Sequence, residues 1–164
     1  MGAIVQVLDA APLARITWTW EPETDILAGA VRPTPSGPAA SLELSGHDGS
    51  VVVLDLAGGG LAGLDVVVWP EVTTVPGLVP PVPARNGRIE VRLEGVAPLL
   101  ELDVALAVRA SSDEQVIHVR VGATRPATVV QVADHLAVEV DPAGGLAGFW
   151  LSGVPPLTSA EEPA

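Results

Sequence analysis

The 164-residue sequence contains no cysteine. Disulfide bonds, zinc–thiolate sites, iron–sulfur clusters and cysteine nucleophiles are therefore excluded. Tyrosine is also absent, and one phenylalanine and four tryptophans are the only aromatic residues. No window has the apolar periodicity of a convincing helix, so we expect low helix content.

Lysine is absent as well: the eight basic residues are all arginine, against 20 aspartates and glutamates, and the net charge is −12. Nucleic-acid binding normally requires basic side chains that displace counterions from phosphates. We therefore expect neither nucleic acid nor an anionic membrane among the partners. The acidic excess is typical of a surface that keeps an apolar chain soluble, and it would also favour a basic protein partner.

Long hydrophobic runs are missing. Runs such as residues 66–70 fall far short of the roughly 18 residues that span a bilayer. Residues 1–6 have neither a basic region nor a myristoylation signal. We expect a cytoplasmic protein with no membrane partner.

Three stretches of the sequence recur in the same order, which predicts an internal duplication. The matching pairs are residues 2–13 with 87–99, residues 25–32 with 113–120, and residues 55–64 with 141–149. The predicted organisation is a first β repeat at 1–78, a proline-rich connector at 79–83, a second β repeat at 84–157, and a flexible acidic tail at 158–164.

Within each repeat the pattern favours strands. Residues 88–94 alternate strictly between apolar and charged side chains, and residues 15–20 alternate in the same way before a turn at 21–25. Residues 51–55 and 64–69 are nearly continuous apolar runs, typical of strands covered on both faces. The sequence predicts an all-β fold of two homologous, mainly antiparallel units packed about a pseudo-two-fold axis, as a sandwich or a barrel-like structure.

Residues 20–27, Trp-Glu-Pro-Glu-Thr-Asp-Ile-Leu, are followed after a gap by a glycine-rich hairpin that ends in Gly-Leu-Asp-Val-Val at 63–67. This arrangement resembles the bacterial family catalogued as domain of unknown function 2283. The resemblance covers residues 14–72 and, more faintly, 102–154. In the second stretch Trp150 stands where the family has an acidic residue. The family has no established activity, so the resemblance implies a compact β-rich module.

Histidine occurs three times, and two of these residues suggest a metal site. His47 and Asp48 precede one predicted strand, while Asp134 and His135 precede the matching strand of the second repeat. If the repeats pack about a two-fold axis, two imidazoles and two carboxylates could meet around a divalent ion. The same residues are also typical of exposed polar turns that bind no metal. His118, between Ile and Val, is typical of a hydrogen-bonded strand residue.

No nucleophile motif, phosphate loop or catalytic carboxylate pair is recognisable. We therefore expect a non-catalytic binding or protein-interaction module without a cofactor, the alternative being a metal-binding protein or metal-dependent enzyme that uses His47 and His135. Tryptophan is enriched at interface hot spots, and a protein partner or self-association would use Trp69, Phe149 and Trp150. An open edge along residues 64–69 is a second predicted contact surface.

Overall fold

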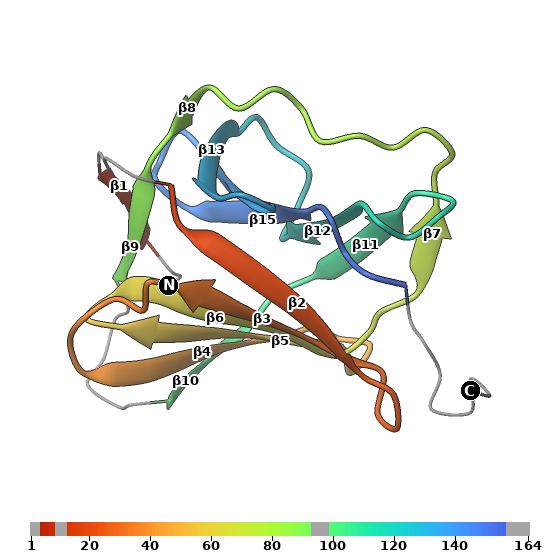
Figure 1. The fold of residues 1–164 in the computed structure, drawn as a ribbon, viewed down its shortest axis with the longest axis horizontal. Helices are drawn as coiled ribbons and strands as arrows, with labels where there is room; N and C mark the ends of the chain where they lie inside the picture. Colours follow the sequence, from red (N-terminus) through yellow and green to blue (C-terminus); the bar gives the residue numbers. More distant parts are fainter. Residues whose placement is uncertain (1–3, 9–12, 93–98, 157–164) are drawn as a thin grey trace.

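The computed structural model describes residues 4–8, 13–92 and 99–156 of the chain. These residues form fifteen strands in two sheets and no helix (Figure 1), which confirms the prediction of an all-β fold. Accordingly, the described ranges hold no helix of the length and hydropathy needed to cross a membrane.

The two sheets contain eight and seven strands. Sheet A consists of β1 (Ile4–Leu8), β2 (Arg15–Glu21), β3 (Ile26–Arg32), β4 (Ala39–Ser45), β5 (Val51–Ala57), β6 (Gly60–Val68), β9 (Arg88–Arg92) and β10 (Leu99–Asp103). Sheet B consists of β7 (Val72–Thr74), β8 (Arg85–Asn86), β11 (Leu106–Ala110), β12 (Ile117–Val121), β13 (Thr128–Ala133), β14 (Leu136–Val140) and β15 (Leu146–Leu151).

Each sheet contains five strands in a corresponding order. Sheet A has β2–β3–β6–β5–β4, and sheet B has β11–β12–β15–β14–β13. The neighbours within each set pair antiparallel. In sheet A the turn between β5 and β6 holds Gly58 and Gly59 at φ values of 58° and 85°, a conformation that glycine adopts without strain. The internal duplication and the repeat boundaries stay predictions.

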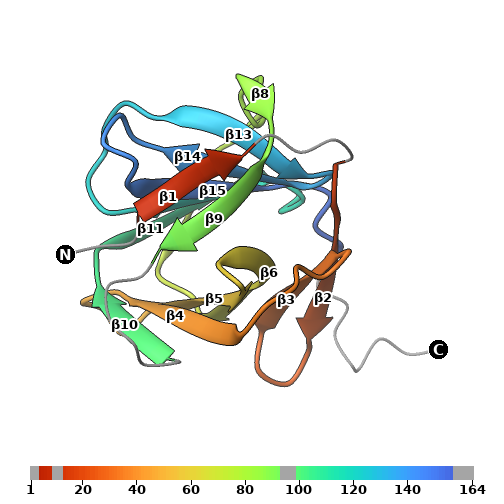
Figure 2. The same ribbon diagram turned by 90° about the vertical axis from the view of Figure 1, so that its left-hand side faces the viewer.

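Strands cross between the predicted repeats, so neither sheet is built from one repeat alone. β9 and β10 lie in sheet A, where β10 runs parallel to β4, whereas β7 joins sheet B parallel to β11. β1 pairs antiparallel with β9 from Ile4 opposite Arg92 to Leu8 opposite Arg88. Figure 2 shows these two strands between the lower part of sheet A and sheet B.

The β1–β9 pair bonds to a hairpin turn in each sheet. The Val91 N–H in β9 donates to Gly59 O of sheet A at 2.7 Å, and the Val5 N–H in β1 donates to Gly144 O of sheet B, also at 2.7 Å. Between the sheets, a single apolar cluster takes side chains from both, including Trp18, Leu64 and Phe149. The two sheets therefore share one hydrophobic core.

The connection from β7 to β8 covers the outer face of sheet B. It crosses above that sheet in Figure 1, and Leu78 packs there against Val129, Ala137 and Trp150. Every residue of β15 is buried, and this cover accounts for the burial of Trp150. In the connector itself Val82 remains 92% exposed.

Indole groups of sheet A hold the segment that follows β15. The Trp18 Nε1–H donates to Ser152 O at 3.1 Å, and the Trp20 Nε1–H donates to Pro155 O at 2.7 Å. Trp69 stacks on Trp20 with ring centroids 5.7 Å apart and donates to Asp25 O at 2.8 Å. Trp18 thus links β2 to the end of sheet B, while Trp69 bonds only within sheet A.

We predict that Trp18→Phe lowers the free energy of unfolding by about 1 to 2 kcal/mol, because it removes the hydrogen bond from a buried indole to the partly buried Ser152 carbonyl. Urea unfolding followed by far-ultraviolet circular dichroism measures this change. Trp69→Phe is the matched control, since its indole is partly exposed and water can replace the lost donor. An equal or larger loss for Trp69→Phe would contradict the link between the sheets.

Candidate functional site

The predicted metal ligands lie in two turns with separate local roles. His47 and Asp48 are exposed in the β4–β5 turn of sheet A. The Asp48 carboxylate accepts the Ser50 N–H at 3.0 Å and the Ser50 hydroxyl. The hydroxyl bond is the main reason why the pKa of Asp48 lies below its ordinary value. This carboxylate stabilises its own turn.

Asp134 and His135 lie in the β13–β14 turn of sheet B. Asp134 Oδ1 accepts the Ile16 N–H of β2 at 2.9 Å, so this carboxylate connects the two sheets. His135 Nδ1 lies 3.5 Å from Ser152 Oγ, at the outer limit of a hydrogen bond. Within the described ranges, no three or more His, Asp or Glu side chains form a group that could hold a metal ion.

The three residues of the predicted interaction surface occupy different environments. Phe149 is fully buried between the sheets, and Trp150 on the other face of β15 is 6% exposed beneath the connector. Trp69 is partly exposed. The interaction surface itself stays a prediction. The predicted open edge along residues 64–69 is wrong, because β6 pairs with β3 and β5 on its two sides.

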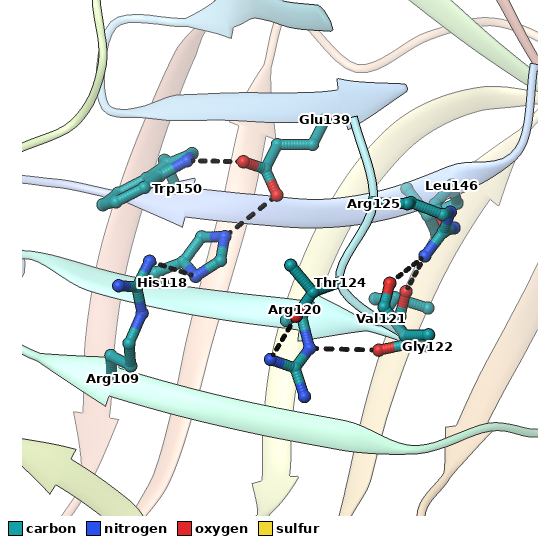
Figure 3. Close-up of polar contacts among 11 residues, drawn as sticks. Arg109, His118, Arg120, Val121, Gly122, Thr124, Arg125, Glu139, Leu146 and Trp150 are labelled. Atoms are coloured by element: carbon teal, nitrogen blue, oxygen red, sulfur yellow. Dashed lines mark hydrogen bonds and ion pairs between the residues drawn. The ribbon is translucent and has the colours of Figure 1, made fainter. Parts of the chain in front are cut away.

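A polar network lies on the outer face of sheet B beneath the connector (Figure 3). His118 Nδ1 is 3.1 Å from Arg109 Nη2, and His118 Nε2 is 2.9 Å from Glu139 Oε1. The Trp150 Nε1–H donates to Glu139 Oε2 at 3.0 Å. The imidazole and indole rings lie 4.3 Å apart between centroids.

The chemistry of arginine assigns the proton positions in this network. A guanidinium nitrogen can only donate, so His118 Nδ1 accepts from Arg109 and the ring proton lies on Nε2, which donates to Glu139. Both ring nitrogens are therefore occupied, and His118 is only 6% exposed. The imidazole has no nitrogen left to take a proton from a substrate, so the network is suited to structure and not to acid–base catalysis.

Glu139 is held in its ionised form. Burial alone would raise the pKa of Glu139, but the hydrogen bonds from His118 and Trp150 and the positive charge of Arg109 outweigh burial and hold the pKa below its ordinary value of 4.5. Glu139 thus accepts two hydrogen bonds and balances the charge of Arg109.

A cavity of about 530 Å³ lies between the sheets, beside β9. We call it the seam cavity. Its described lining comes from both sheets and from the β3–β4 connection, and consists of Leu13, Ala14, Val31, Pro33, Thr34, Pro35, Ser36, Leu61, Asn86, Gly87, Arg88, Ile89 and Val132.

The seam cavity has an apolar floor and a polar rim. Val31, Leu61 and Ile89 are buried, whereas rim residues such as Thr34 and Arg88 are exposed. Sequence reasoning did not identify this site. Its lining residues come from segments as far apart as Leu13 and Val132, and they carry no motif that would mark them as neighbours.

We predict that Glu139→Gln lowers the free energy of unfolding by about 1 to 3 kcal/mol at pH 7. The carboxylate accepts hydrogen bonds from His118 and Trp150, whereas the NH₂ group of glutamine is itself a donor and leaves one of these two donors without an acceptor. Since the folded-state pKa is depressed, the stabilisation by ionised Glu139 is present above pH 4.5 and is lost as the pH falls towards the folded-state pKa. The difference between wild type and variant should therefore shrink below pH 4.5.

Urea unfolding at a series of pH values measures this difference. Glu71→Gln, at an exposed position between β6 and β7, is the control for loss of a carboxylate, and its free energy of unfolding at pH 7 should be close to that of wild type. A Glu139→Gln deficit that grows as the pH falls would contradict the assignment of Glu139 as an ionised acceptor.

No family model and no curated protein matches the chain. The resemblance of residues 20–27 and 63–67 to domain of unknown function 2283 stays a prediction.

Proposed function

We propose that this chain is a non-catalytic binding protein that takes up a small molecule in the seam cavity. The observation that carries the proposal is the cavity itself. Its volume of about 530 Å³ lies within the range of small-molecule sites, roughly 300 to 1,000 Å³. Its apolar floor and polar rim also match the usual composition of such sites, in which apolar area supplies affinity and a few polar groups orient the ligand.

The described polar groups support binding over catalysis. His118 uses both ring nitrogens in the network with Arg109 and Glu139. His135 approaches Ser152, but the neighbouring carboxylate of Asp134 bonds to Ile16 and not to the imidazole, so this pair lacks the third group that orients a catalytic base.

The metal alternative has less support. Asp48 and Asp134 already accept hydrogen bonds within the fold, and the described ranges hold no cluster of ligands around His47 or His135. No observation on these residues favours a metal-dependent activity over ligand binding.

We predict that the neutral probe 1-octanol binds in the seam cavity, because burial of its alkyl chain against Val31, Leu61 and Ile89 is favourable. Titration followed by amide chemical shifts should move the signals of Gly87, Ile89 and Val31. Leu61→Trp should abolish these shifts by filling the floor, and Ser36→Trp, at the exposed rim, should weaken them.

Val53→Trp, on the outer face of sheet A, is the matched control for added indole volume and should leave octanol binding unchanged. Circular dichroism establishes that each variant is folded. Ser36→Trp tests the site even if Leu61→Trp fails to fold. Shifts that are absent up to the solubility limit of octanol, or that cluster away from the cavity, would contradict the proposed function.

A further inference from the structure

We infer that the ligand of the seam cavity is a small amphiphile with one negative charge, an aliphatic carboxylate. This inference rests on the proposed function and specifies the ligand class. Three observations lead to it: the charge of the cavity lining, the contacts of the Arg88 guanidinium, and the apolar and polar residues of the floor and the rim.

The described lining of the cavity has the opposite charge to the chain. The chain carries 20 acidic residues and a net charge of −12, yet Arg88 is the single charged residue among the described lining residues, which include no aspartate or glutamate. A lone positive group at the rim favours an anion and disfavours a cation. One arginine matches one negative charge, so a monoanion fits better than a polyanion.

Arg88 differs from other arginines of the chain in its contacts. Arg92, on the same strand, lies 3.9 Å from a carboxylate oxygen of Glu90 and donates to Gln6 at 2.8 Å. Arg125 donates to Asp141 at 2.9 Å. Within residues 4–8, 13–92 and 99–156, the Arg88 guanidinium has no hydrogen bond or ion pair. Arg88 can therefore offer a planar pair of donors to a carboxylate.

The other lining residues favour a ligand with an aliphatic chain. Val31, Leu61 and Ile89 form a buried floor, and none of the described lining residues is aromatic. A planar ring or a sugar would therefore find no stacking platform, whereas an alkyl chain can bury its methylenes against branched side chains. Thr34, Ser36 and Asn86 at the rim supply further hydrogen-bond donors for a carboxylate.

Isothermal titration calorimetry with octanoate, 1-octanol and octylammonium tests the ligand class on the full chain, below the micelle concentration of each probe. We expect octanoate to bind about tenfold tighter than octanol, because a charge-assisted hydrogen bond adds to the same apolar contact, and we expect octylammonium to bind weakest. Octanoate affinity should fall with added salt, while octanol affinity should not. Between hexanoate and octanoate, affinity should rise about fourfold for each methylene.

Arg88→Gln should reduce octanoate affinity to the octanol level and leave octanol binding unchanged. Arg92→Gln is the matched control on the same strand, outside the described lining, and should leave both affinities unchanged. Equal binding of octanoate and octanol, or octanoate binding that Arg88→Gln does not weaken, would overturn the carboxylate assignment while the proposed function stands. Binding of none of the probes would overturn both.

Discussion

The antiparallel pairing of β1 with β9 is the interaction on which the rest of the structure depends. Each strand also bonds to a hairpin turn, Val91 to Gly59 in sheet A and Val5 to Gly144 in sheet B. The pair therefore joins the sheets through the backbone, in addition to the side chains of the shared core. Sheet A includes β9 and β10, which follow the connector in the chain. The first predicted repeat on its own would therefore lack two strands of sheet A.

One strand of this pair, β9, also lines the seam cavity. β9 lies at the junction of the sheets, and it contributes both Ile89 to the apolar floor and Arg88 to the rim. Alternation along a single strand thus supplies a buried apolar group and an exposed charged group to one site. The outer face of sheet B has a different role, because the connector covers it and the network around Glu139 uses its polar groups internally.

The strands were predictable where the pattern is local. The alternation of residues 88–94 and the hairpin of residues 15–31 match β9 and the β2–β3 pair, because apolar periodicity reflects burial on one face. The pairing of β9 with β1 was not predictable, since it joins residues about 85 positions apart and no local signal sets the partner.

The candidate sites were less predictable for the same physical reason. Trp150 carries an aromatic side chain suited to an interface, but its burial depends on Leu78, which lies more than 70 residues earlier. His47 and His135 occupy similar positions in the two predicted repeats, yet the carboxylates beside them bond to different partners, Ser50 and Ile16. The sequence pattern places Arg88 only in an alternating strand, because its place at a cavity depends on residues from four other segments of the chain.

Differential scanning calorimetry of the full chain tests most directly whether the β1–β9 pair couples the two sheets into one cooperative unit. If the pair couples the sheets, the protein unfolds in a single transition whose calorimetric and van't Hoff enthalpies are equal. Two separate transitions, or a calorimetric enthalpy well above the van't Hoff value, would show that the sheets unfold independently and would contradict this coupling.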